Sequence, residues 1–145
     1  MKKKNDGTPS QDMFVEKMKA IYGEKGVFVY RLTDTKEVRG AVKASGGNAV
    51  GFAKATPSDY ILTASGTMWY AEVKSTQDKT SFGFSCFTPG QWGGMKMQVA
   101  AGGQYIVYVH RLETNQWYGI SALTILRAVA DGKKSFKWKE MPEWL

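Results

Sequence analysis

Cysteine and histidine are almost absent from this chain. Cys86 and His110 are the only residues of their kinds among 145. A single cysteine cannot close an intramolecular disulfide, and one cysteine with one histidine cannot supply the four ligands of a structural zinc site. We expect Cys86 to be a small residue in or near the core. His110 ends a strand-like run, and we expect it to be hydrogen-bonded or exposed rather than a general base.

Long apolar runs are absent as well. No stretch approaches the roughly 20 apolar residues of a membrane-spanning helix. The lysine-rich start is not followed by the hydrophobic segment of a signal peptide, and the sequence has no internal repeat or low-complexity segment. We therefore expect a soluble, cytoplasmic protein with no membrane partner.

Basic residues outnumber acidic ones by 20 to 13, which gives a formal net charge of +7. The excess remains when residues 1–6, with three lysines and one aspartate, are left out. Such a charge favours a polyanionic partner such as nucleic acid. The alternative is an ordinary solvated basic surface with no special partner.

Apolar periodicity predicts one α/β domain at 8–145, preceded by a flexible basic tail at 1–7, with a mixed central β-sheet flanked by helices. In residues 8–11, Thr8 is the expected N-cap and Gln11 closes a capping box, and the same Thr-Pro-x-Gln pattern recurs at 88–91. The predicted elements are helices at 8–22, 88–101 and 121–130 and strands at 26–33, 56–63, 68–75, 105–112 and 116–120. The predicted helices should bury one apolar stripe each, made of Phe14, Met18, Ile21, Tyr22, Trp92, Met95, Val99, Leu123, Leu126 and Val129.

The strands at 56–63 and 68–75 are joined by a Ser-Gly turn and predict a hairpin. Side chains alternate along a strand, so Glu72 and Lys74 share one face of a largely apolar strand. Asp59 opens the neighbouring strand. Because a buried carboxylate is costly unless it is paired or binds a metal, Asp59 and Glu72 favour a site for partly hydrated Mg²⁺. The alternative is a surface strand whose Glu–Lys pair faces solvent.

The segment around this hairpin, from about residue 56 to 95, resembles the PD-(D/E)xK nuclease superfamily and within it the RecU-type Holliday junction resolvases of phages and bacteria. The most specific part of the resemblance is the Lys-Thr-Ser-Phe run at 79–82 together with Gln91 at the start of the next helix. The resemblance implies a restriction-endonuclease-like core, branched DNA as the partner and a homodimer.

The resemblance also implies residue roles. Asp59, Glu72 and Lys74 match the catalytic positions, Gln91 adjoins them, and Glu16 is the acidic residue of the first helix. Asp59, Glu72 and the Val73 backbone carbonyl would bind Mg²⁺, for which Mn²⁺ is a plausible substitute. From the residues alone, Glu16 is equally well explained as a solvated helix carboxylate, and Gln91 as a cap of its own helix.

Further basic residues extend the expected DNA surface. The loop at 34–54 is glycine-rich and basic, and long loops in compact domains are often functional; an unimportant surface loop is the alternative. We also expect Gly93 and Gly94 to allow a DNA backbone to pass close to their helix. The residues expected to contact DNA are Lys36, Arg39, Lys43, Lys54, Lys79 and Thr80.

Two questions stay open at this point. Near the C-terminus, Phe136 and Trp138 alternate with lysines, which favours packing of a terminal strand over stacking on unpaired bases. The function has two alternatives to a junction resolvase, which are a nuclease of the same superfamily that cuts flaps, nicked DNA or duplex DNA, and a catalytically silent DNA-binding module.

Overall fold

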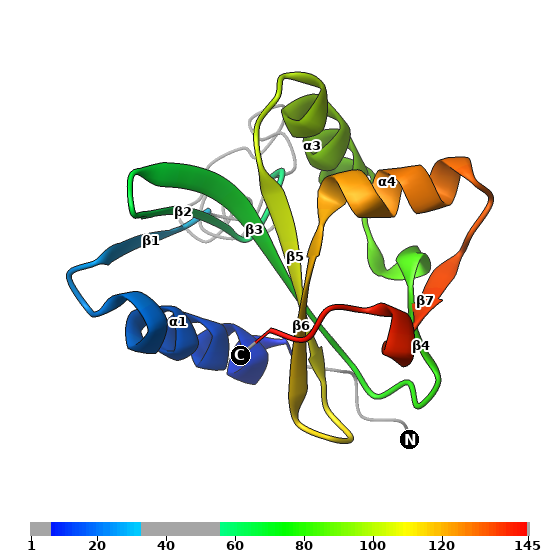
Figure 1. The fold of residues 1–145 in the computed structure, drawn as a ribbon, viewed down its shortest axis with the longest axis horizontal. Helices are drawn as coiled ribbons and strands as arrows, with labels where there is room; N and C mark the ends of the chain where they lie inside the picture. Colours follow the sequence, from blue (N-terminus) through cyan, green and yellow to red (C-terminus); the bar gives the residue numbers. More distant parts are fainter. Residues whose placement is uncertain (1–6, 33–55, 145) are drawn as a thin grey trace, which may run out of the picture.

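A five-stranded mixed sheet forms the centre of the computed structural model, which describes residues 7–32 and 56–144. Its strands are β1 (Val27–Arg31), β2 (Tyr60–Ala64), β3 (Thr67–Thr76), β5 (Tyr105–Arg111) and β6 (Gln116–Ser121). They lie side by side in the order β1-β2-β3-β5-β6 (Figure 1). β3 and β5 are parallel, and the other neighbours are antiparallel. The predicted fold class, a mixed sheet flanked by helices, is confirmed.

Helices cover both faces of this sheet. α1 (Thr8–Tyr22) packs on one face, whereas α3 (Pro89–Ala100) and α4 (Ala122–Ala130) lie on the other (Figure 1). A small second sheet pairs β4 (Ser81–Gly83) with β7 (Ser135–Lys137), and two 3-10 helices, η1 (Phe84–Cys86) and η2 (Trp138–Glu140), follow these strands. None of the helices in the described ranges has the length and apolar character needed to cross a membrane.

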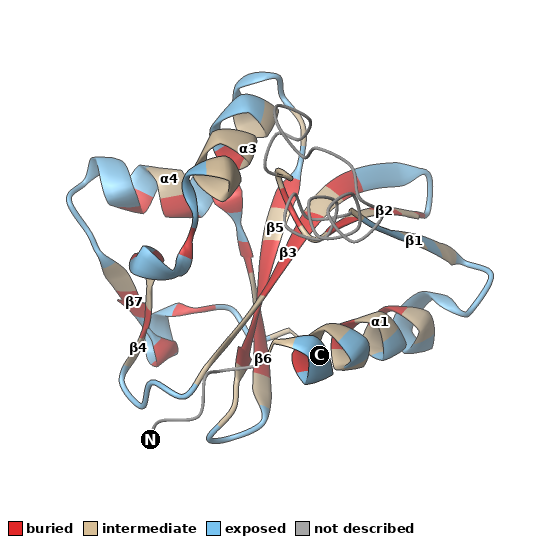
Figure 2. Cartoon of the chain, turned by 180° about the vertical axis from the view of Figure 1, so that it is seen from behind, coloured by how far each residue is buried: buried red, intermediate tan, exposed pale blue. Residues whose placement is uncertain are grey.

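Two hydrophobic clusters hold the layers together, one on each face of the sheet. The α1 side contains Phe14, Met18, Leu62, Ala71 and Val73, and the other side contains Met95, Val107, Ile125, Phe136 and Trp138, among others. Figure 2 shows the buried residues concentrated along β3 and β5, in the middle of the sheet. The central strands are therefore buried on both faces, and polar side chains on them need partners.

The helix starts were predicted with mixed success. Thr88 caps α3 and forms the predicted capping box with Gln91. The corresponding prediction at Thr8 is wrong, because α1 already includes Thr8 and its N-cap is Gly7, without a side-chain cap bond. The pattern occurs at both sites, but in α1 the chain turns into the helix one residue earlier.

The buried stripes of two helices also differ from the prediction. α4 buries Ala122, Ile125 and Ala128, while Leu123 and Val129 are 38% and 41% exposed. The helix begins directly after β6, and this short connection fixes its rotation, so small alanines face the core. In α1, Phe14 and Met18 are buried as predicted, but Ile21 and Tyr22 in its last turn are exposed, although the Tyr22 ring still contacts Trp69.

Three isolated predictions are resolved by burial. Phe136 and Trp138 pack in the core, as favoured from their alternation. His110 is buried and hydrogen-bonded, to Ser10 Oγ at 2.8 Å and Asn115 Oδ1 at 2.7 Å, so it is a satisfied histidine as expected. Cys86 was expected in or near the core; it lies at the end of η1 near the buried Phe84 and Phe87, and the residue itself is exposed, so it is near the core rather than in it.

Candidate functional site

The register of the hairpin places Asp59 beside Glu72. The turn has positive φ at Ser65 and Gly66, as a two-residue hairpin turn requires. Tyr60 then pairs with Ala71, so residues 72–76 of β3 extend past the start of β2. Asp59 lies beside this extension, where its N–H donates to Glu72 Oε2 at 3.1 Å. Two acidic residues 13 positions apart are thus in direct contact.

Asp59 is also bonded to the backbone of β3. The Val73 N–H donates to Asp59 Oδ2 at 2.9 Å. Because the N–H and C=O of one strand residue point to the same side, the Val73 carbonyl faces the edge where Asp59 lies. This edge of β3 therefore offers a carbonyl oxygen next to two carboxylates.

The segment before β2 is held in place from several directions. The Tyr105 hydroxyl donates to the Pro57 carbonyl, and Ser58 Oγ donates to the Tyr60 carbonyl at 2.9 Å. α3 packs so closely that a Cβ on Gly94 would lie 2.6 Å from Pro57 Cβ. Asp59 consequently sits at the end of a loop with little freedom to move.

Gly94 corrects one prediction. A DNA backbone is not needed to explain this glycine, because the loop at Pro57 already occupies the space that a side chain would take. At Gly93 an added Cβ meets nothing within 4 Å. The sequence marked Gly94 as unusual in a helix, but nothing local indicated that Pro57, 37 positions earlier, was its neighbour.

Glu72 and Lys74 lie on the face of β3 opposite to α1. Trp69, Ala71 and Val73 belong to the cluster under α1, so the alternation predicted from the sequence is present. Glu72 is only 2% exposed, whereas Lys74 is half-buried. The surface-strand alternative, with both side chains facing solvent, does not describe this strand.

Gln91 connects the start of α3 to both of these residues. Its Nε2 donates to Glu72 Oε1 at 2.8 Å, and its Oε1 accepts from Lys74 Nζ at 2.9 Å. The same Oε1 accepts the Thr88 N–H at 3.0 Å, which closes the capping box. The capping role and the contact with Glu72 and Lys74 therefore occur together.

The ammonium group of Lys74 is held among oxygen atoms. It donates to the Cys86 carbonyl at 3.0 Å as well as to Gln91, and lies 3.6 Å from Glu72 Oε1. Cys86 accepts this bond through its backbone carbonyl, so the chemistry of its side chain could not indicate the contact in the sequence. A cation is fixed beside two acids at the first turn of a helix, where backbone N–H groups also favour negative charge.

Both carboxyl groups are shifted toward the neutral form. Burial raises the pKa of Asp59, against the opposing effect of the hydrogen bond from Val73 N–H. Burial, followed by repulsion from Asp59, raises the pKa of Glu72 well above its ordinary value, with Lys74 acting in the opposite direction. A cation bound between them would remove part of the repulsion, so the pair favours a positive ligand.

The donor set fits a partly hydrated metal rather than a closed protein site. Within the described ranges, no three or more His, Cys, Asp and Glu side chains group together in a way that could hold a metal ion. Two carboxylates and a backbone carbonyl leave positions for water and a substrate oxygen, which is the environment that Mg²⁺ prefers. The residues present therefore fit Mg²⁺ and would bind it weakly without substrate.

Glu16 is not brought into this group. It is exposed on α1, which covers the opposite face of the sheet from Glu72. The charge of Asp12, an exposed acid one turn earlier, contributes to the raised pKa of Tyr60, the residue next to Asp59.

The residues expected to bind DNA are only partly described. Lys79 and Thr80 are exposed in the loop after β3. Four others lie outside the described residues, together with the loop at 34–54 that carries them: Lys36, Arg39, Lys43 and Lys54.

Comparisons with known proteins support the fold. No family model matches the sequence, and no curated protein matches it significantly. Among solved structures, the chain is similar to Hjc from Archaeoglobus fulgidus, a Holliday junction resolvase from an archaeal hyperthermophile, with a TM-score of 0.51 over 92% of each chain. The chain thus has the restriction-endonuclease-like fold of that protein. Since the two sequences are 15% identical, the likeness extends to the fold alone.

Proposed function

We propose that this protein is a Mg²⁺-dependent endodeoxyribonuclease that cuts four-way DNA junctions, of the RecU type within the PD-(D/E)xK nucleases. The observation that carries the proposal is the contact of Asp59, Glu72, Lys74 and Gln91 at the first turn of α3. A protein that only binds DNA would gain nothing from two buried carboxylates where phosphate approaches, because they would repel it.

In this proposal Asp59, Glu72 and the Val73 carbonyl hold Mg²⁺, which Mn²⁺ can replace. When bound, the ion would polarise the scissile phosphate and lower the pKa of a bound water. Lys74 holds the attacking water and offsets the negative charge that develops on the phosphate. Gln91 is a positioning residue, since its amide orients both Lys74 and Glu72.

The junction assignment adds a requirement on assembly. Resolution of a four-way junction needs two symmetric cuts, and one active site per chain then requires a homodimer with a two-fold axis. Binding should depend mainly on phosphate contacts and weaken steeply with salt.

The central experiment compares substrates. The protein is incubated with Mg²⁺ and a labelled four-way junction, a linear duplex and a flap in parallel. We expect paired symmetric cuts in the junction and little cutting of the duplex. Equal cutting of all three substrates would indicate a general nuclease of the same fold instead of a junction resolvase. An uncut junction would favour a catalytically silent DNA-binding module.

The matched variants are Asp59→Asn and Glu72→Gln, with Asp131→Asn, an exposed acid after α4, as the control. We expect the first two to reduce cleavage by at least about a thousandfold, as removal of metal-mediated charge stabilisation does, while junction binding remains. Mn²⁺ should raise the melting temperature of the wild type and the control, but not of Glu72→Gln. Loss of binding together with cleavage would indicate that these residues support the fold instead.

A further inference from the structure

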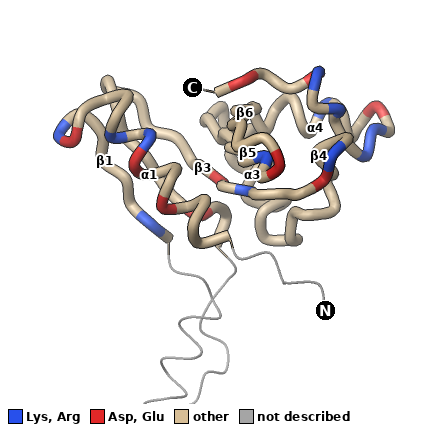
Figure 3. Tube along the Cα trace, turned by 90° about the horizontal axis from the view of Figure 1, so that it is seen from below, with Lys and Arg blue, Asp and Glu red and all other residues tan. Residues whose placement is uncertain are grey.

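A basic pocket lies at the end of β5 and the start of β6, and its lining includes none of Asp59, Glu72, Lys74 and Gln91. Its volume is about 750 Å³, and the residues that line it include Lys79, Arg111, Lys137 and Lys139 with a single acid, Glu143. In Figure 3 several Lys and Arg positions lie around β4, on the side of the molecule away from β1. The pocket joins parts of the chain that are about 60 residues apart, from the loop after β3 to η2.

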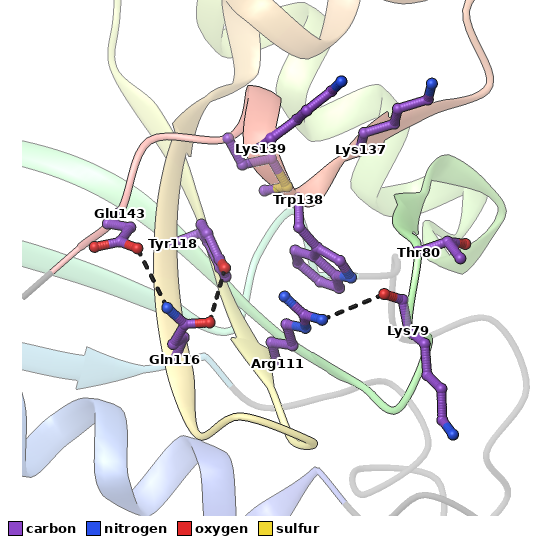
Figure 4. Close-up of a pocket in the computed structure, with 10 residues that line it drawn as sticks. Lys79, Thr80, Arg111, Gln116, Tyr118, Lys137, Trp138, Lys139 and Glu143 are labelled. Atoms are coloured by element: carbon purple, nitrogen blue, oxygen red, sulfur yellow. Dashed lines mark hydrogen bonds between the residues drawn. The ribbon is translucent and has the colours of Figure 1, made fainter.

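Arg111 lines this pocket and contacts several groups of the protein, including Glu113, whose Oε2 lies 3.7 Å from Arg111 Nη2. Its guanidinium lies 5.1 Å from the ring centre of Trp138, and Nη2 donates to the Lys79 carbonyl at 3.3 Å (Figure 4). Trp138 is fixed in turn, because its Nε1 donates to the Asp78 carbonyl at 3.0 Å. These contacts hold a cation at one place, so a ligand would not have to order it on binding.

The guanidinium also retains unused hydrogen-bonding capacity. Arg111 Nε is buried, and no acceptor for it lies among the residues that the structure describes. A buried donor without a partner is destabilising, so the position of Arg111 needs an explanation. The Arg111 side chain is 18% exposed, so an anion in the pocket would place acceptor oxygens beside the accessible part of the guanidinium.

The aromatic residues of the pocket indicate which anion it would recognise. Trp138 is 7% exposed and Tyr118 is 3% exposed, so neither ring presents a free face on which a base can stack. Lys137 and Lys139 instead extend into solvent from the C-terminal segment (Figure 4). The chemistry is that of phosphate binding without base recognition.

The pocket lies on the same face of the sheet as Glu72 and Lys74. Arg111 pairs with Thr76 in the parallel register of β3 and β5, and Thr76 is two residues beyond Lys74 on β3. Residues two apart on a strand share a face and are separated by roughly 6 to 7 Å. A nucleic-acid backbone that reaches Lys74 can therefore continue toward Arg111.

We propose that this pocket binds a backbone phosphate of the nucleic acid outside the bond that is cut. The proposal rests on the nuclease function proposed above. The pocket supplies affinity and position without reading sequence, and the cleavage chemistry stays at Asp59 and Glu72.

The test measures DNA binding in the Asp59→Asn background with EDTA, so that cleavage plays no part. Lys137→Gln/Lys139→Gln removes two exposed charges from the pocket, and Lys25→Gln/Lys96→Gln removes two exposed charges that do not line it. Arg111→Lys keeps the charge but removes the guanidinium fork. Affinity for a four-way junction is followed by fluorescence anisotropy across a salt series, and melting temperature shows whether each variant is folded.

We expect Lys137→Gln/Lys139→Gln to weaken binding about five- to tenfold and to lower the slope of log K against log salt by roughly 1 to 2. Arg111→Lys should weaken binding by a similar factor, while the control pair changes it less than twofold. The proposal is overturned if the control pair loses as much DNA affinity as Lys137→Gln/Lys139→Gln, or if neither of these two double variants loses affinity. In the cleavage-competent protein, the pocket variants should cut at the normal rate once DNA is saturating, so a protein that cuts nothing contradicts only the nuclease function.

A small phosphate compound would bind through the same groups as a DNA phosphate, so a separate experiment distinguishes the two ligands. Melting temperatures are measured in sodium phosphate and in sodium chloride of equal ionic strength. If phosphate stabilises the wild type but not Lys137→Gln/Lys139→Gln, and DNA binding is equal in the two proteins, the pocket takes a free phosphate compound and the nucleic-acid assignment is overturned.

Discussion

The amide of Gln91 joins the first turn of α3 to the buried carboxylate of Glu72. Nε2 donates to Glu72 Oε1 at 2.8 Å, while Oε1 accepts from Lys74 Nζ at 2.9 Å and from the Thr88 N–H at 3.0 Å. A side chain that closes a capping box therefore also fixes the relative positions of an acid and a cation on β3. The helix start and the site depend on the same residue.

Replacing Gln91 by alanine should separate these two roles when compared with Thr88→Ala. Each variant breaks the capping box and should destabilise the protein by about 1 kcal/mol. Only Gln91→Ala also releases Lys74 and Glu72, so we expect its cleavage rate at saturating DNA to fall roughly tenfold to a hundredfold while that of Thr88→Ala stays near normal. Urea unfolding and single-turnover cleavage provide the two measurements.

An equal fall of the cleavage rate in Gln91→Ala and Thr88→Ala would contradict the positioning role, because it would show that Gln91 acts only through the stability of α3. Gln91→Glu is a second variant for the same question. It places a carboxylate beside Glu72, and the added repulsion should impair cleavage even where the helix start is kept.

The stability of the metal-free protein should depend on Glu72 in a defined direction. Its pKa is raised in the folded state, so its contribution to stability is complete below the ordinary value of 4.5 and is lost as the pH rises through the folded-state pKa. We expect Glu72→Gln to be more stable than the wild type at neutral pH in EDTA. The difference in melting temperature should grow as the pH is raised above 4.5 and then level off.

The control for this pH series is Asp131→Asn, which should follow the wild type at every pH, since Asp131 is exposed at the end of α4. A Glu72→Gln protein that is less stable than the wild type across the whole series would show that the carboxylate is favourable in the fold, against the direction of its pKa shift.

The first helix allows a direct comparison of two acids. Both Glu16 and Asp12 are exposed on α1, and of the two only Asp12 contributes to the raised pKa of Tyr60, next to Asp59. We expect Glu16→Gln to retain cleavage within about twofold, because surface substitutions away from a site have small effects. Asp12→Asn should reduce cleavage more, measured at limiting Mg²⁺. A large loss in Glu16→Gln alone would restore the role that the resemblance assigns to Glu16.

Local patterns predicted the parts of this site that depend on short-range geometry. The alternation of β3 placed Glu72 and Lys74 on one face, and the hairpin turn fixed the register that brings Asp59 to them. The capping box at Thr88 is also local, although the same pattern failed at Thr8. Each of these features is determined by residues within about 15 positions of one another.

Features that depend on how distant segments pack were not predictable in this way. The rotation of α4, which exposes Leu123 and Val129, is set by its connection to β6 rather than by the helical period. The Tyr105 hydroxyl donates to the carbonyl of Pro57, which lies 48 positions earlier in the sequence. The pocket at Arg111 combines residues of the loop after β3 with residues of the C-terminal segment. Neither contact leaves a periodic signal in the sequence.

The two glycines in the first half of α3 offer the sharpest test of how the Asp59 loop is held. An added Cβ at Gly94 would lie 2.6 Å from Pro57 Cβ and 2.8 Å from the Pro57 backbone, whereas at Gly93 it would meet nothing within 4 Å. Gly94→Ala must therefore push α3 away from the loop, and we expect a loss of roughly 1 to 3 kcal/mol in the free energy of unfolding. Gly93→Ala should instead stabilise the protein by up to about 1 kcal/mol, since alanine is the better helix former.

The two variants should also differ in cleavage, because displacement of the loop moves Asp59 relative to Glu72, which it contacts at 3.1 Å. We expect Gly94→Ala to lose cleavage under conditions where it is fully folded, and Gly93→Ala to keep it. Weaker DNA binding in Gly93→Ala would instead indicate that DNA passes close to this helix. If Gly94→Ala were as stable and as active as Gly93→Ala, the close contact with Pro57 would not be what fixes Asp59.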